Sequence, residues 1–245
     1  MINLELRQGL LASLADLEAG DTVLVGLSGG ADSLSLLKCA VVVGKAQSIN
    51  VGAVIIDHQI QAESAKTSQV AAQAATDLGA DPVLIFNVDV ATGPGSGGME
   101  AAARDARRQA FARVAVEHNA KAILLGHTLE DQAETVLLGL ARGSGARSLS
   151  GMRAAEGIYR RPFLNVDRET VRSEVKDLVA FEDPHNSDTK FSRVRVRNTI
   201  LPILESELGP GVTQALVRSA DLLRDDADAL DALARFEITR VGDDV

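Results

Sequence analysis

The sequence predicts an α/β protein with a doubly wound, mostly parallel five-stranded sheet and a C-terminal helical extension. Short apolar runs rich in β-branched residues alternate along the chain with longer segments of helical character, the pattern of βαβ units. After residue 181 the alternation stops, and a polar stretch leads into two segments typical of helices. The chain has 245 residues, of which 46% are hydrophobic and 24% charged, as in ordinary globular proteins.

The expected strands are short, apolar and bounded by turn-forming or polar residues. They are residues 21–27, 51–57, 81–88, 122–126 and 158–163. The expected helices show small and apolar residues at helical spacing. They are residues 34–43, 62–79, 99–118, 129–140, 168–180, 194–208 and 212–236. We expect one α/β domain over residues 1–182, and a loop with a helical extension over residues 183–245.

Composition excludes several classes of protein. The apolar runs are far shorter than the roughly 20 residues of a membrane helix. The N-terminal segment lacks the basic start and apolar stretch of a signal peptide, so we expect a cytoplasmic protein without membrane contact. Cys39 is the single cysteine, which excludes disulfides within the chain and cysteine metal clusters.

Positive charge is concentrated in the middle of the chain. The net charge is -9 overall, but it is +4 over residues 101–200, against -7 over residues 1–100 and -6 over residues 201–245. A local basic face can bind phosphates even when the whole protein is acidic. Charge alone fits solvated helix faces equally well.

A glycine-containing turn follows the first expected strand. Gly29 and Gly30 permit positive φ and a close approach of the backbone to a ligand. The next helix directs its free N–H groups and its positive dipole end to the same point. Asp32 would repel a phosphate unless it held a divalent cation, for which Mg²⁺ is the candidate. The expected phosphate-binding residues are Ser28, Gly29, Gly30, Ala31, Asp32 and Ser33.

The turn matches neither the lysine-containing loop of P-loop NTPases nor the dinucleotide-binding fingerprint. A glycine turn with a serine cap is the structural alternative. In parallel sheets, ligands bind beyond the carboxyl ends of the strands. Ser28, Asp57 and Gly126 all fall at such ends, so we expect them to converge on one crevice.

Residues 27–37, LSGGADSLSLL, resemble the pyrophosphatase loop of the N-type ATP pyrophosphatases, a superfamily with an adenine nucleotide alpha hydrolase-like fold. The resemblance implies that residues 1–182 form the catalytic domain, and that ATP is cleaved between its α and β phosphates. The acceptor is then adenylated, pyrophosphate leaves, and a nucleophile displaces AMP.

Further segments are similar to the tRNA(Ile)-lysidine synthases. GHTLEDQAET at 126–135 and EDPHNSD at 182–188 are the most specific, and the match runs over about residues 23–223. The resemblance implies that ATP activates the 2-oxo group of the wobble cytidine in a tRNA(Ile) with a CAU anticodon. The ε-amine of free L-lysine then attacks, giving lysidine, AMP and pyrophosphate. Longer family members carry further C-terminal tRNA-binding domains, which we expect to be absent from this chain.

Asp131 and Glu134 are three residues apart on an expected helix and so share a face. They suit the lysine ammonium or Mg²⁺, and the residues alone do not decide between these roles. A charged first helical turn, favoured by the dipole, is the alternative. Glu130 fits these roles less well than its neighbour Asp131.

His58 is a candidate to hydrogen-bond the nucleotide or accept a proton, and His127 is a weaker one. Arg104 shares a face with Glu100 and Arg108, and either meets a phosphate or pairs with Glu100. The candidate catalytic residues are Asp32, His58, Arg104, Asp131 and Glu134.

Six arginines of the basic middle region are the expected contacts to tRNA phosphates. They are Arg142, Arg147, Arg161, Arg193, Arg195 and Arg197. Aromatic residues make up only 3% of the chain, so base stacking would rest on Tyr159 or Phe191. Residues 191–197 have a valine where the family usually has asparagine. The oligomeric state stays open, a homodimer included.

Three other functions compete with this interpretation. A tRNA thiolase of the same superfamily usually needs paired cysteines or a cluster, and Cys39 stands alone. An amide-forming ligase acting on a metabolite would not need the arginine-rich middle. A non-catalytic nucleotide-binding module would have no reason for Asp131 and Glu134.

Overall fold

The computed structural model describes residues 2–57, 64–88, 99–178, 180–181 and 188–242, with the backbone alone at 99–104 and 240–242. Contacts divide the chain into two units. Unit 1 comprises Met1–Thr128 and Ala154–Asp183, and unit 2 comprises Leu129–Arg153 and Pro184–Val245. The division differs from the one expected from the sequence, because the helices within 129–153 pack against the C-terminal helix. That the catalytic domain ends at residue 182 stays a prediction.

Unit 1 contains a sheet of six strands in the order β3-β2-β1-β4-β6-β5. The strands are β1 (Thr22–Gly26), β2 (Asn50–Asp57), β3 (Val83–Asn87), β4 (Ala120–Leu124), β5 (Ala155–Glu156) and β6 (Tyr159–Arg160). All neighbours are parallel except β5 and β6. The expected fifth strand, 158–163, is therefore reduced to two residues, and a sixth strand precedes it. Gly157 has φ +58° and closes the tight hairpin between them.

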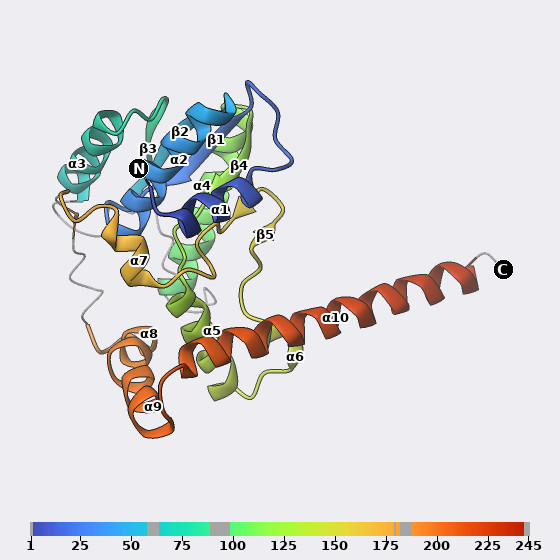
Figure 1. Cartoon of the computed structure of the whole chain (residues 1–245). Coiled ribbons are helices and arrows are strands. Elements are labelled where there is room, and N and C mark those ends of the chain that lie inside the picture. The colour runs from blue at the N-terminus through green and yellow to red at the C-terminus, as the bar shows by residue number, and fades with distance from the viewer. Residues whose placement is uncertain (1, 58–63, 89–98, 179, 182–187, 243–245) are drawn as a thin grey trace. The chain divides into compact units, whose positions relative to one another are not determined.

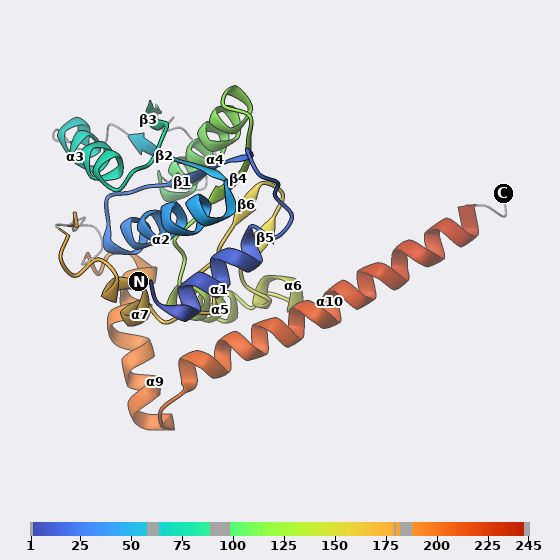
Figure 2. The ribbon, with the colours of Figure 1, turned by 45° about the horizontal axis from the view of Figure 1, so that its top comes forward.

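Helices cover both faces of this sheet, which confirms the doubly wound fold (Figures 1 and 2). The helices α2 (Ala31–Gln47), α3 (Ser64–Asp77) and α4 (Met99–Glu117) pack against the strands. Two further helices, α1 (Leu4–Ser13) and α7 (Arg168–Ser173), pack against α2. Side chains of β1 alternate between the faces. Val23 and Val25 join the core cluster under α1, α2 and α3, whereas Leu24 packs with Phe111 and Val114 of α4. The helix expected over 168–180 ends at Ser173.

The strand order reverses at β1, which lies between β2 and β4. Such a switch point opens a crevice beyond the carboxyl ends of the strands. At this point the chain passes so close to the turn that glycine is needed at position 126. A Cβ on Gly126 would lie 3.1 Å from the carbonyl oxygen of Asp32 and 3.3 Å from the Cα of Ser33. The segments after β1 and β4 thus lie against each other.

Unit 2 is helical. Its elements are α5 (Leu129–Ala141), α6 (Ala146–Leu149), α8 (Ser192–Arg195), the π-helix η2 (Val196–Ile200), α9 (Leu201–Leu208) and α10 (Val212–Gly242). Ala133, Val196, Leu201 and Val217 form its small apolar core. In the described part of the chain, no helix combines the length and apolar character that crossing a membrane requires.

Candidate functional site

The turn after β1 is shaped for an anion. Gly29 adopts φ +80°, and the Ser28 and Ser33 hydroxyl oxygens lie 3.2 Å apart. The Ser33 hydroxyl also donates to the Gly30 carbonyl oxygen at 2.9 Å. Gly30 is the N-cap of α2 and provides no side-chain acceptor for the first amides of the helix. The positive end of a 17-residue helix therefore faces the turn without a side-chain cap.

The Asp32 carboxylate is engaged by two arginines of α7. Arg172 binds it with a two-pronged contact, Nε to Oδ1 at 2.7 Å and Nη2 to Oδ2 at 3.2 Å. The Nε of Arg168 lies 3.6 Å from Oδ2. Neither Arg168 nor Arg172 is among the site residues expected from the sequence. Their spacing of four residues in an expected helix, beside a phosphate loop without a lysine, was the available signal.

The residues of the turn provide few ligands for a metal. Among the residues that the structure describes, no group of three histidine, cysteine or acidic side chains is placed to hold a metal ion. Asp32, Ser28 and Ser33 offer oxygen donors, the type that Mg²⁺ takes. A magnesium ion would fit here only if phosphate oxygens and water supplied most of its ligands.

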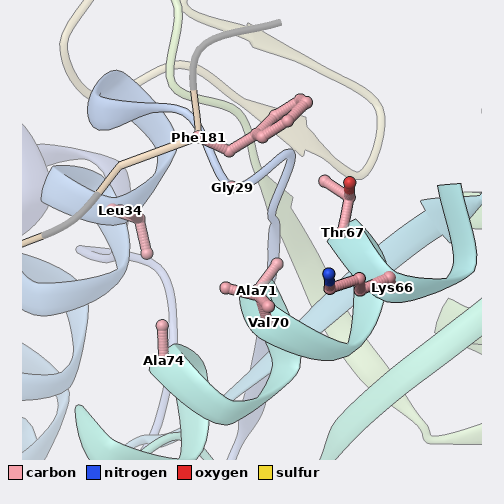
Figure 3. Close-up of a pocket in the computed structure, with 8 residues that line it drawn as sticks. All are labelled: Gly29, Leu34, Lys66, Thr67, Val70, Ala71, Ala74 and Phe181. Carbon is pink, nitrogen blue, oxygen red and sulfur yellow. The ribbon is translucent and has the colours of Figure 1, made fainter. Parts of the chain in front are cut away.

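A pocket of about 160 Å³ adjoins the turn (Figure 3). Gly29 and Phe181 form one side of it, and the Phe181 amide donates to the Gly29 carbonyl oxygen at 2.9 Å. The other walls are Leu34 of α2 and residues of α3, with Lys66 and Thr67 as the polar members. The pocket thus offers apolar space with one positive charge, that of Lys66, beside the turn. No pattern in the sequence indicates that Phe181 or α3 lies at the turn.

Of the other residues of unit 1 that the sequence predicts at the site, only some lie in the part of the chain that the structure describes. Asp57 ends β2 and is buried. His58 and the side chain of Arg104 lie outside the described residues. The guanidinium of Arg108 lies 5.2 Å from the ring centroid of Tyr159. Since Tyr159 is buried, it offers no open face for stacking a base.

In unit 2, Asp131 and Glu134 form an ion-pair cluster with arginines of α8 and η2. Glu134 is 0% exposed, and its carboxylate accepts from Arg193 Nε at 3.0 Å and from Arg197 Nε at 2.6 Å. Arg197 also donates to Asp131 Oδ1 at 2.9 Å. The two arginines are four residues apart and share a helix face. Two residues expected at RNA are therefore counter-ions of the two expected lysine-binding carboxylates.

The remaining arginines differ in exposure. Arg161 is 7% exposed, and its Nη2 lies 3.6 Å from Oε2 of Glu156. Its guanidinium therefore has little exposed surface with which to contact an RNA phosphate. Arg195 donates to the carbonyl oxygens of Thr189 and Lys190. Arg142 and Arg147 are exposed, and Arg147 pairs with Asp231 of α10. Only some of the six arginines thus present surface to a large polyanion.

Cys39 is buried in α2. Burial raises the pKa of its thiol to about 12. The thiolate is the nucleophilic form of cysteine, so this side chain is unreactive near neutral pH.

Comparisons with known proteins show the family and the fold of the chain. The profile of the PP-loop domain family ATP_bind_3 matches residues 4–204. A tRNA(Ile)-lysidine synthase of Thermobifida fusca is 51% identical over 96% of this chain and 72% of its own length. One of Streptomyces coelicolor is 50% identical over 87% of this chain and 61% of its own length. A solved U34-tRNA thiolase of Methanococcus maripaludis superposes with a TM-score of 0.71 over 90% of this chain and 78% of its own, at 21% identity, which shows a common fold alone.

Proposed function

The chain belongs to the tRNA(Ile)-lysidine synthase family of PP-loop proteins, and from this premise we propose that it ligates lysine to the wobble cytidine of a tRNA(Ile) with a CAU anticodon. ATP would adenylate the 2-oxygen of the cytidine with release of pyrophosphate. Adenylation converts a poor leaving group into AMP. The ε-amine of free lysine then forms the new C–N bond as AMP departs, with loss of a proton from nitrogen.

In unit 1, we assign the turn formed by 28–33 to the β and γ phosphates of ATP. The amides at the N-terminus of α2 and the hydroxyls of Ser28 and Ser33 can donate to phosphate oxygens. The adjoining pocket with Lys66 gives space for part of the nucleotide. Mg²⁺, carried mainly by the phosphates, would neutralise their charge, with Asp32 as its protein ligand.

In unit 2, we assign different roles to the two carboxylates. Asp131 keeps 13% of its side chain exposed, whereas Glu134 is fully buried and both of its oxygens accept from arginines. Asp131 is therefore the better partner for the lysine ammonium, and Glu134 holds Arg193 and Arg197 in place. His58 and Arg104 stay proposed catalytic residues.

For tRNA, we propose Arg142, Arg147 and Arg195 as phosphate contacts because all three are exposed. We leave Arg161 out of this set, since its side chain is buried. A cytoplasmic location and a homodimer stay predictions.

The observation that carries the proposal is the 51% identity to a lysidine synthase over 96% of the chain. The test is incubation with ATP, Mg²⁺, labelled lysine and a panel of tRNAs. We expect label in the CAU tRNA(Ile) alone, and much less with Asp131→Asn. Label in no tRNA would contradict the proposal, and ATP–pyrophosphate exchange without any RNA would favour a metabolite ligase.

A further inference from the structure

The phosphate turn carries a negative side chain and no positive one. Asp32 is its single charged residue, although the turn faces the uncapped N-terminus of α2. A bound triphosphate would bring several further negative charges to the same place. Positive charge must therefore come from another segment, and α7 supplies it through Arg168 and Arg172.

The helix that carries both arginines is held beside the turn by contacts that do not involve Asp32. The Ser35 hydroxyl of α2 donates to the carbonyl oxygen of Val171 at 2.6 Å, in a buried position. Lys38 of α2 donates to the carbonyl oxygen of Glu174. Asp167 caps α7 by accepting from the Thr170 amide at 2.7 Å. Because α7 is fixed to α2 in this way, Arg172 stays next to the turn whether or not its carboxylate partner is available.

The contact between Arg172 and Asp32 is suited to exchange. The Arg172 side chain is 51% exposed and that of Asp32 is 23% exposed, so solvent screens the pair. The guanidinium already makes a two-pronged contact with a carboxylate, and the same planar fork matches two oxygens of a phosphate. The Asp32 carboxylate thus occupies a position at the N-terminus of α2 where a bound anion would also be stabilised.

We propose that Arg172 is a pyrophosphate-binding residue that moves its fork from Asp32 to the terminal phosphates when the nucleotide binds. This inference rests on the proposed function, since it assigns the turn to ATP. The exchange leaves Asp32 available to the metal that the phosphates carry. Arg168, which is more buried, stays as the second positive charge at the same position.

The test is calorimetric titration of the full chain with pyrophosphate in EDTA, so that no metal contributes. Arg172→Gln should weaken pyrophosphate binding about tenfold, which corresponds to roughly 1.4 kcal/mol. Arg172→Lys keeps the charge but loses the planar two-pronged contact, so its affinity for pyrophosphate should lie between those of the wild type and Arg172→Gln. AMP lacks the terminal phosphates, so its binding should be unchanged. Lys45→Gln is the matched control: it removes one exposed positive charge near the opposite end of α2, about 20 Å away.

A double-mutant cycle with Asp32→Asn separates direct binding from an effect through Asp32. If Arg172 contacts phosphate, Arg172→Gln weakens pyrophosphate binding by a similar factor in the Asp32→Asn background. If Arg172 only neutralises Asp32, that factor falls to one and the inference is overturned. Unchanged binding in Arg172→Gln alone would overturn it as well. A wild-type chain that binds neither ATP nor pyrophosphate would instead contradict the proposed function.

Discussion

Arginine pairs with carboxylate in both units, but with different consequences. At the phosphate turn of unit 1, Asp32 and Arg172 remain partly exposed. In unit 2, Glu134 is fully buried and two arginines share its carboxylate. A screened pair contributes little stability and can change partners, whereas a buried carboxylate must keep its counter-ions. The exposed pair can thus change partners when a ligand binds, whereas the buried pairs hold the fold.

The largest expected effect is the loss of stability when the buried carboxylate of Glu134 is removed. Glu134→Ala leaves Arg193 and Arg197 without their shared counter-ion, and we expect the free energy of unfolding in urea to fall by about 3 kcal/mol. Asp231→Ala, which removes the partly exposed partner of the exposed Arg147 in the same unit, is the control, with an expected loss below about 1 kcal/mol. Equal losses in the two variants would remove the distinction between them.

At the exposed pair, we expect a substitution to affect activity strongly and stability only weakly. Asp32→Ala should change the free energy of unfolding by less than about 1 kcal/mol, because the pair is screened. Adenylation of tRNA should nevertheless be lost, since the same carboxylate is proposed to serve the nucleotide. Single-turnover release of pyrophosphate measures this, and an active Asp32→Ala would defeat the proposed role.

A smaller, pH-dependent effect on stability is expected from Glu205, which caps the start of α10. Hydrogen bonds from the Thr213 hydroxyl and from the amides of Thr213, Gly211 and Val212 lower the pKa of Glu205 to about 2. A carboxyl with a lowered folded-state pKa stabilises the protein fully above its ordinary pKa of 4.5, and this contribution is lost as the pH falls towards 2.

Glu205→Gln should therefore lower stability at pH 7 by about 1 kcal/mol, the usual contribution of a helix cap. Its difference from the wild type should shrink between pH 4.5 and 2 in thermal melts. A difference that stays constant with pH would show that the charge on Glu205 is not what caps the helix.

The smallest effect concerns Cys39 and the thiolase alternative. Since burial raises the pKa of the thiol to about 12, iodoacetamide should not label the folded protein at pH 8. Cys39→Ala should ligate lysine at the wild-type rate. Loss of activity in a folded Cys39→Ala protein would reopen the alternative of sulfur chemistry.

Local patterns in the sequence predicted most of unit 1. The alternation of apolar runs and helices identified β1 to β4 and the helices after them, and the glycine turn was placed correctly between β1 and α2. That this turn binds phosphate stays a prediction. The pair β5 and β6 was harder, because two-residue strands are too short to show a period. The helix at 168–180 was expected too long, because apolar spacing does not mark where a helix ends.

Partners distant in the chain could not be read from spacing. Arg172 is 140 residues from Asp32, and Arg197 is 63 residues from Glu134. The sequence indicated charged residues of the expected types, but it did not indicate which charges neutralise one another. Charge alone places Arg193 and Arg197 at RNA, and the structure adds that they bind buried or partly buried carboxylates. Their contact with RNA stays a prediction.

The most direct measurement of the central claim identifies the nucleotide product. The protein is incubated with ATP labelled at the α phosphate, together with lysine and the CAU tRNA(Ile). We expect labelled AMP in an amount equal to the unlabelled pyrophosphate released, formed only when the tRNA is present. ADP and inorganic phosphate as products, or AMP formed equally well without RNA, would contradict it.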